Sequence, residues 1–287
     1  MVLKQSGRMS GRKTGMIEEN DIIYKPLIDD MTWSYSRLSS YESCPYMWKL
    51  TYIDEIPKED MFYTKYGSLM HEILQKFLNG KDESQLKTDF IIGFTELVQS
   101  GIYGKPKVNV INNYLTTGLE FLNNGLPQFA QEIENAEIKC VEKRFYFKIK
   151  EIKFVGICDL VVEKDNKLIL IDHKSHNLKQ KSGRKKPTVA DEELDKYLRQ
   201  LYLYSQPLYE VYGRYPEELW FNCFRTGIIV KEKFNEKAFK KSCEWAESLV
   251  DKISNDNEFE ENYSYFFCNY ICDKHENCWI WEAEKGD

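Results

Sequence analysis

The segment from Glu137 to Ser175 constrains the fold more than any other part of the sequence. β-Branched and aromatic residues dominate its runs EIKCVEKRFYFKI and KFVGICDLVVEKDNKLILIDHKS, and this composition predicts three β-strands. Asp165–Asn166 lies between the second and third strands and is typical of a two-residue hairpin turn, so Lys164 should pair with Lys167. One turn therefore sets the register of the predicted hairpin, and with it the face on which each side chain lies.

Helical patterns flank this segment. The run KYGSLMHEILQKFL repeats apolar residues at helical spacing, and a second amphipathic helix is predicted from about Asp191 to Val211. ELWFNCF and IIVKEKF predict two more strands joined by a hairpin. We expect an α/β fold with a central mixed sheet flanked by helices. The expected organisation is a flexible basic arm at 1–30 and a single domain at 31–287, made of a helical region at about 66–135, a core at about 137–232 and a cysteine-rich segment at 262–281.

Charge excludes one class of nucleic-acid binder. The chain has 40 Lys and Arg against 46 Asp and Glu, for a net charge of −6, so it is no histone-like polycation. A local basic groove would still be enough to bind phosphates. No apolar run is long enough for a signal peptide or a membrane span, so we expect a cytoplasmic protein without membrane contact.

The hairpin register brings two carboxylates together. It places Asp159 directly opposite Asp172, and Lys174 on the same face of the sheet. Opposed like charges destabilise a sheet, and a divalent cation between them would offset the repulsion. Carboxylate and water ligands suit Mg²⁺ or Mn²⁺, and such a site can hydrolyse a phosphodiester. The alternative is a solvent-facing hairpin with no catalytic role.

These residues resemble the RecB-type branch of the PD-(D/E)XK nuclease superfamily. The resemblance rests on GICDLV, LILIDHKS, the upstream helix GSLMHEIL and the downstream QLYLYSQ, in this order, and it covers about residues 31–287. It implies the nuclease fold of that family, in which a mixed sheet is flanked by helices.

The resemblance also implies roles for individual residues. Asp159 and Asp172 would bind the metal together with His71, and the backbone carbonyl of His173 would be a further ligand. Lys174 would position the attacking water. Gln200 and Tyr204 lie one helical turn apart and would contact the DNA backbone or support the catalytic residues. Glu142 is considered only as a supporting acid.

The eight cysteines divide into two groups. Cys44 and the clustered Cys268, Cys272 and Cys278 resemble the layout of nucleases such as the AddB nuclease domain and the CRISPR-associated adaptation exonucleases, in which four cysteines hold a [4Fe–4S] cluster. The gap between Cys268 and Cys272 is one residue longer than is usual there. Zinc is the alternative, with His275 as an alternative ligand. The other four are expected to be small buried residues: Cys140, Cys158, Cys223 and Cys243.

One dense basic run, LKQKSGRKKP, follows the proposed site. Its position predicts phosphate contacts, whereas a solvated loop is the usual reading of such a run. The cations are Lys179, Lys181, Arg184, Lys185 and Lys186.

The resemblance favours a metal-dependent DNA exonuclease acting on free ends, with a preference for single strands, in recombination, repair or phage DNA metabolism. No GxxxxGK[ST] motif is present, so no motor of the Walker type is expected, and a helicase or recombination partner would fit. The alternatives are a non-catalytic DNA-binding or assembly module that retains the fold, and a structure- or sequence-specific endonuclease.

Overall fold

The computed structural model describes residues 24–100, 102 and 104–284. Its strands are β1 (Glu137–Ile149), β2 (Ile152–Lys164), β3 (Lys167–Lys174), β4 (Glu218–Cys223) and β5 (Ile228–Lys233). Its helices are α1 (Lys25–Asp29), α2 (Tyr35–Ser43), α3 (Pro45–Tyr52), α4 (Phe62–Leu78), α5 (Glu83–Gln99), α6 (Val108–Glu120), the π-helix η2 (Phe121–Gly125), α7 (Leu126–Glu132), α8 (Val189–Tyr212), α9 (Glu236–Ser254), α10 (Tyr265–Tyr270), the 3₁₀ helix η3 (His275–Asn277) and α11 (Trp279–Glu284).

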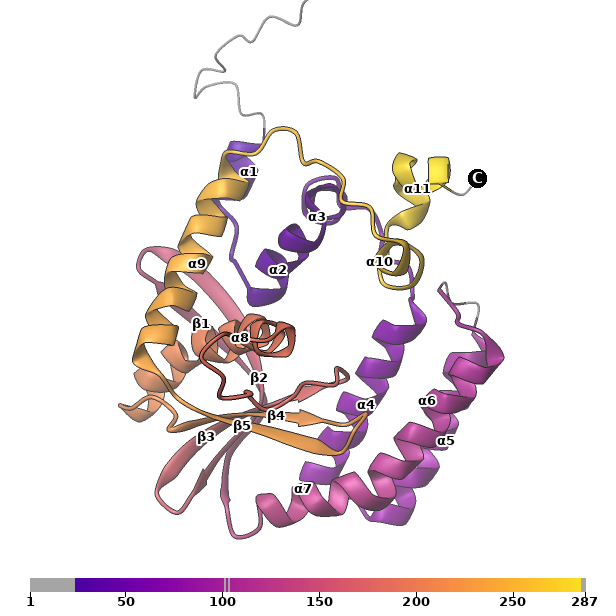
Figure 1. The fold of residues 1–287 in the computed structure, drawn as a ribbon, viewed down its shortest axis with the longest axis vertical. Helices are drawn as coiled ribbons and strands as arrows, with labels where there is room; N and C mark the ends of the chain where they lie inside the picture. Colours follow the sequence, from indigo (N-terminus) through magenta and orange to yellow (C-terminus); the bar gives the residue numbers. More distant parts are fainter. Residues whose placement is uncertain (1–23, 101, 103, 285–287) are drawn as a thin grey trace, which may run out of the picture.

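The five strands form one mixed sheet in the order β1-β2-β3-β4-β5 (Figure 1). Among the neighbouring strands of this sheet, β3 and β4 run parallel and the other pairs run antiparallel, and α8 connects β3 to β4. Asp165 and Asn166 both have positive φ, at 52° and 61°, as a two-residue hairpin turn of the primed type requires. The register runs from Lys164–Lys167 to Leu160–Ile171. The predicted α/β class, mixed sheet and hairpin register are therefore confirmed.

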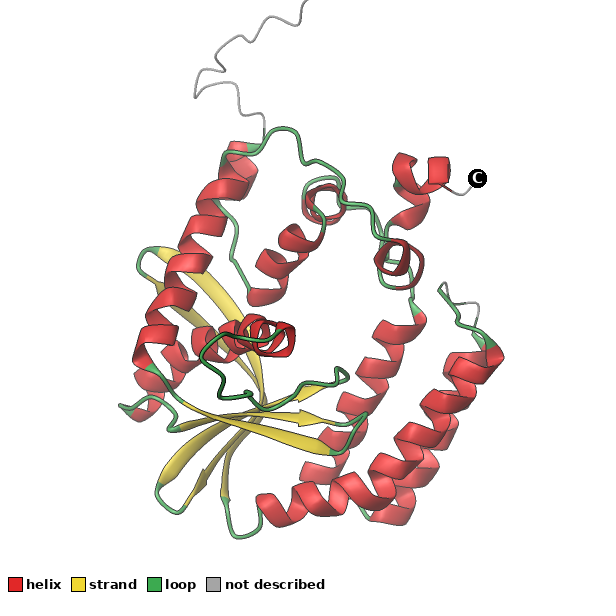
Figure 2. Ribbon diagram, in the orientation of Figure 1, coloured by secondary structure: helices red, strands yellow, loops and turns green. Residues whose placement is uncertain are grey.

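Helices cover both faces of the sheet (Figure 2). Leu160 and Ile171 belong to a core shared with α4 to α7, whereas Val161 and Leu170 belong to a core shared with α8 and α9. Successive residues of β2 and β3 thus point into opposite cores, as the period of a strand dictates. The near-continuous apolar runs of these strands follow from burial on both faces.

Helix α8 is fixed at both ends by local chemistry. Thr188 and Asp191 form a reciprocal capping box at its start, and Gly213 ends it in the left-handed conformation with φ 71°. This long helix packs on the sheet and carries Gln200 and Tyr204 toward β2 and β3. Burial decreases at the end of β3, where Asp172 is buried and Lys174 is partly exposed.

The two ends of the described chain lie against the domain. Helix α1 buries Ile28 completely, so residues 25–29, within the expected arm, contribute to the core. Residues 1–23 of that arm lie outside the described residues, and the division of the chain into an arm and one domain stays a prediction. Near the other end, the buried Lys274 donates to the Pro57 carbonyl over 3.0 Å, and the Glu59 amide donates to the Asp273 carbonyl over 3.3 Å.

No helix in the described part of the chain has both the length and the apolar character needed to cross a bilayer.

Candidate active site

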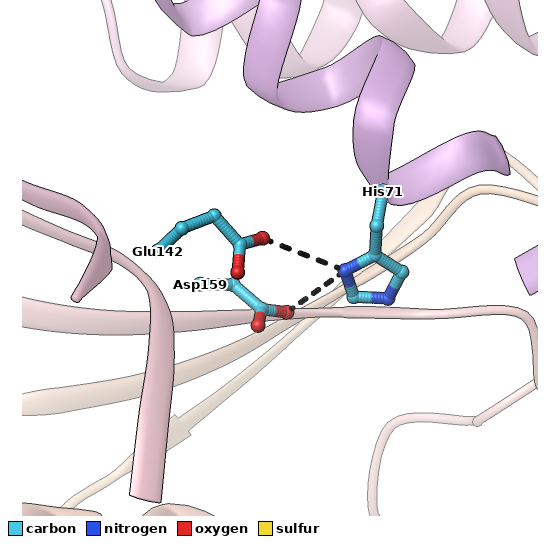
Figure 3. Close-up of side chains that lie close together, drawn as sticks. All are labelled: His71, Glu142 and Asp159. Atoms are coloured by element: carbon cyan, nitrogen blue, oxygen red, sulfur yellow. Dashed lines mark ion pairs between the residues drawn. The ribbon is translucent and has the colours of Figure 1, made fainter. Parts of the chain in front are cut away.

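Three side chains from three different elements converge at one point beside the sheet. His71 comes from α4, Glu142 from β1 and Asp159 from β2 (Figure 3). The His71 Nδ1 atom lies 3.8 Å from Glu142 Oε1 and 3.6 Å from Asp159 Oδ2. One ligand atom from each residue lies within 4.8 Å of the other two, which is close enough for one ion to touch all three.

Glu142 reaches this position through an unusual backbone conformation. Its φ is +47°, a left-handed value that costs a residue with a Cβ atom about 1–3 kcal/mol. The β1–β2 ladder pairs Val141 with Leu160 and Lys143 with Cys158, and Glu142 lies between these pairs, opposite Asp159. From the sequence, Glu142 is expected only as a supporting acid. The positive φ that brings its carboxylate to the cluster could not be predicted, because glutamate rarely adopts a left-handed backbone.

Buried charge dominates the site. Burial and the neighbouring Asp172 carboxylate raise the pKa of Asp159 to about 7, although His71 and the amide of His173 act in the opposite direction. Burial lowers the pKa of His71, but Glu142, Asp159 and Asp172 more than offset it, so the pKa of His71 is raised. Glu142, Asp159 and Asp172 thus place three carboxylates close together where little solvent screens them. A bound cation would reduce the repulsion between them.

The end of β3 supplies the remaining polar groups. Asp172 Oδ2 accepts a salt bridge from Lys174 Nζ at 2.8 Å, and Lys174 also donates to Gln200 Oε1 over 2.7 Å. The His173 amide donates to Asp159 Oδ2 over 2.8 Å. Asp172 therefore faces the lysine and lies outside the three-residue cluster, although its charge acts on both Asp159 and His71. The structure brings all the expected residues of β2, β3 and α8 together and adds Glu142.

His173 and Tyr204 are largely buried, although His173 also lines a hollow beside α4 and Tyr204 a hollow beside β1. The His173 ring is buried, lies 3.1 Å from the Asn222 side-chain nitrogen through Nδ1, and burial holds its pKa well below the usual range. Tyr204 packs on Gly156, where a Cβ atom would stand 2.4 Å from its ring. A glycine is needed there because any side chain would displace the tyrosine. The proposed metal contact of the His173 carbonyl stays a prediction.

Two hollows border the cluster, and Glu142 lines both. The α4 hollow has a volume of about 600 Å³, and its lining includes Tyr63, Gly67, His71, Glu142, Lys174 and Phe224. The β1 hollow has a volume of about 780 Å³, and its lining includes Arg37, Glu142, Arg144, Asp159, Gln200 and Tyr204. A substrate that fills both hollows would pass the cluster.

The donor set fits a hard divalent cation. One imidazole nitrogen and two carboxylates converge, with a third carboxylate at Asp172 nearby, and carboxylate-rich sites with room for water suit Mg²⁺ or Mn²⁺. Burial and the neighbouring Asp172 raise the pKa of Asp159, so a cation beside this carboxyl would favour its ionised form. The residues therefore could hold one divalent ion.

The basic run after β3 is tied down. The Asp191 carboxylate accepts from the Ser182 amide and hydroxyl over 2.7 Å each, and Lys181 pairs with Asp195 at 2.8 Å. None of the five cations of this run is among the residues that line the two hollows within the described chain. Contact between Lys179, Arg184 or their neighbours and DNA stays a prediction.

The four expected cysteine ligands also meet. Cys44 caps the start of α3 and lines one nearly closed hollow, of about 10 Å³, together with Cys268, Cys272 and Cys278. In the part of the chain that the structure describes, no three of the sulfur atoms lie within 4.8 Å of one another. Four thiolates around one zinc ion would lie about 3.8 Å apart, because each Zn–S bond is about 2.3 Å long and the geometry is tetrahedral. Of the four cysteines expected to be buried, Cys158 and Cys223 are buried, whereas Cys140 and Cys243 are only half-buried.

Comparisons with known proteins agree with this architecture. A family model described as the PD-(D/E)XK nuclease superfamily matches residues 32–278. A crystal structure of a provisionally named exonuclease from Eubacterium rectale is similar, with a TM-score of 0.51, 10% identity, and coverage of 95% of this chain and 100% of that one. At this identity, the similarity shows the fold alone. No curated protein sequence matches the chain.

Proposed function

The chain belongs to the PD-(D/E)XK nuclease superfamily, and from this premise we propose that it is a metal-dependent deoxyribonuclease that degrades DNA from its ends. The observation that carries the proposal is the convergence of His71, Glu142 and Asp159, with Lys174 held beside them by Asp172 and Gln200. A fold that had lost catalysis would have no need to keep these groups together around a buried Asp159 and a Glu142 with positive φ.

His71, Glu142 and Asp159 would hold the metal, and Asp172 would complete the set while it keeps its salt bridge to Lys174. A divalent ion supplies charge neutralisation at the scissile phosphate and lowers the pKa of a nearby water. Asp159 is oriented for this role by the His173 amide, and Asn222 holds the neutral His173 ring in place.

Lys174 would act on the attacking water or on the phosphate. Its ammonium group is held by two acceptors at 2.7 and 2.8 Å, so its position is set before substrate arrives. A positioned ammonium stabilises the negative charge that develops on phosphate oxygens. Gln200 is a positioning residue in this proposal, because its observed partner is the lysine.

Exonuclease action on single-stranded ends is the finer part of the proposal. It is supported by the RecB-type motifs and by the provisional name of the similar protein from E. rectale. DNA recombination, repair or phage metabolism, together with a helicase or recombination partner, stays a prediction from the same resemblance.

We propose further that Cys44, Cys268, Cys272 and Cys278 hold a [4Fe–4S] cluster. The four side chains line one hollow, and it is their resemblance to the cysteine layout of the cluster-binding nucleases that favours a polynuclear cluster over a single zinc ion. Such a cluster would tie the start of α3 to the end of the chain, and its role would be structural.

A nuclease assay tests the function directly. Wild-type protein is mixed with end-labelled linear single strands, linear duplex and closed circles, with Mg²⁺ or Mn²⁺ and with chelator. The proposal expects metal-dependent loss of linear DNA, fastest for single strands, with circles spared. Discrete cutting of circles would favour an endonuclease. DNA binding without cleavage, equal in wild type and Asp172→Ala, would favour a non-catalytic module.

Iron and sulfide analysis of anaerobically purified protein tests the cluster. We expect about four of each per chain and broad visible absorption. A colourless protein with one zinc would overturn the cluster proposal and leave the nuclease proposal standing.

A further inference from the structure

The β1 hollow contains positive charge that none of the roles assigned above uses. Arg37 and Arg144 line it together with two members of the proposed metal site, Glu142 and Asp159. The expected DNA contacts fall on the basic run after β3, whose cations line neither hollow in the described chain. Arg37 and Arg144 therefore share the surface of the β1 hollow with the carboxylates, whereas Lys174 lines the α4 hollow and is already assigned to the chemistry.

Arg144 is free to bind an anion. Its side chain is exposed on β1, two residues beyond Glu142, and no ion pair or hydrogen bond engages it among the described residues. An exposed arginine so near buried carboxylates would ordinarily be expected to pair with one. Its free guanidinium group keeps five donors in a planar fork that fits phosphate oxygens.

Arg37 is held in position. One of its guanidinium nitrogens donates to the Thr32 carbonyl over 2.6 Å, and the group lies 4.5 Å from the centre of the Tyr52 ring. Stacking and one hydrogen bond fix the plane of the group, while its other nitrogens have no protein partner in the described chain. A donor that is already oriented loses little freedom when it binds.

The same hollow offers a stacking surface. Tyr146 lies two residues beyond Arg144 on the exposed face of β1, and its side chain is 71% exposed. An aromatic ring beside a basic groove is how proteins bind single strands without reading sequence, because every unpaired base has a π-face. A base inside a duplex cannot stack this way.

We propose that the β1 hollow is a binding site for one strand of DNA, in which Arg37 and Arg144 hold backbone phosphates and Tyr146 stacks on an unpaired base. This inference rests on the proposed function, since it supplies the strand that passes from the β1 hollow across the metal site to the α4 hollow. The strand-binding residues would place the scissile phosphate without taking part in the chemistry.

Binding measured apart from cleavage tests this site. Fluorescence anisotropy with a labelled oligothymidine in Ca²⁺ gives the affinity of the full-length protein, with its cysteine ligands intact, at several salt concentrations. Arg144→Ala should weaken binding about tenfold and reduce the slope of log K against log salt by about 0.7, the value for one lost single-strand phosphate contact. Lys240→Ala is the matched control, because Lys240 is an exposed cation on α9 that lines neither hollow and pairs with Glu236 at 2.8 Å.

Two tyrosine variants isolate the stacking contribution. Tyr146→Ala should weaken single-strand binding about tenfold. Tyr146→Phe should bind with the affinity of wild type, because stacking involves the aromatic ring and not the hydroxyl group. Arg144→Ala and Tyr146→Ala should raise KM in Mg²⁺ and change kcat little, because both residues bind the strand away from the reacting phosphate.

The outcomes separate this inference from the proposed function. Unchanged affinity and salt slope in Arg144→Ala, with wild-type protein that cleaves DNA, would overturn the strand site and leave the nuclease intact. Reduced binding in Arg144→Ala, with wild-type protein that never cleaves, would support the strand site and overturn the nuclease. Wild-type protein that does not bind single strands would contradict the strand site outright.

Discussion

The carboxylate site and the cysteine site both gather ligands from distant parts of the chain, but they differ in how the fold holds them. His71, Glu142 and Asp159 lie within 4.8 Å of one another, and the fold holds them there against repulsion and backbone strain. The four thiols share a hollow, and hydrogen bonds such as that from the Lys274 ammonium to the Pro57 carbonyl hold their segment. The first region is organised for chemistry at a cost in stability, and the second is organised to join the chain ends.

The largest effects are expected when charge is removed from the carboxylate site. Asp159→Asn should lower kcat/KM at least about 10³-fold, because a catalytic metal contributes several kcal/mol to transition-state stabilisation. The same variant should raise the Tm of metal-free protein by at least about 2 °C near pH 8, because the repulsion with Asp172 is gone. A variant that loses both activity and stability would show that Asp159 is structural.

The cysteine site should respond in the opposite way. Cys268→Ser should lower Tm by about 10 °C, since a cross-link that closes so long a loop contributes about 4 kcal/mol. Its kcat, measured well below the new Tm, should stay close to wild type. Cys243→Ser is the control, because Cys243 is half-buried outside the hollow. Equal Tm values for the two variants would mean that no cross-link is present.

Lys174 and Gln200 share one hydrogen bond in the carboxylate site, and their substitutions should lower kcat by different amounts. Lys174→Ala should lower kcat about 10²–10³-fold, because it removes a charge directed at the reacting phosphate. Gln200→Ala should lower kcat only about tenfold, because the lysine keeps its salt bridge to Asp172. Single-turnover cleavage at saturating DNA measures both. Equal losses would make Gln200 a catalytic residue.

The carboxylate site should also make the stability of the metal-free protein and its affinity for Mn²⁺ depend on pH. The raised pKa of Asp159 means that the metal-free folded state binds a proton that the unfolded state has released above about pH 4, so stability falls as pH rises from about 4 to 7. The raised pKa of His71 extends this loss above the usual histidine pKa. Metal binding displaces these protons, so as pH falls below about 7 the Kd for Mn²⁺ should rise about tenfold per unit for each proton displaced, and about a hundredfold where both are.

Calorimetric titration of Mn²⁺ at about pH 6 and about pH 8 checks this expectation, and heat capacity scans of metal-free protein check the stability trend. The effect of pH on the cysteine site should be separate, because neither Asp159 nor His71 is near it. An affinity that does not change between the two pH values would place the metal away from Asp159.

Much of this arrangement could be predicted from local sequence. The Asp165–Asn166 turn set the register of β2 and β3 as far as the Leu160–Ile171 pair, next to Asp159 and Asp172, because a two-residue hairpin turn fixes which residues pair. Three features lay beyond sequence reasoning. The positive φ of Glu142 arises from the packing of β1 on β2, the free guanidinium of Arg144 depends on which carboxylates lie near it, and the tethering of the basic run depends on Asp191 from a different element.

The most direct test of the central claim is a crystal structure of the protein soaked in Mn²⁺, with anomalous diffraction collected at the manganese edge. The account predicts one strong peak bounded by the His71 imidazole and the carboxylates of Glu142 and Asp159. A peak elsewhere, or manganese that binds in solution but leaves these three side chains without a peak, would contradict it.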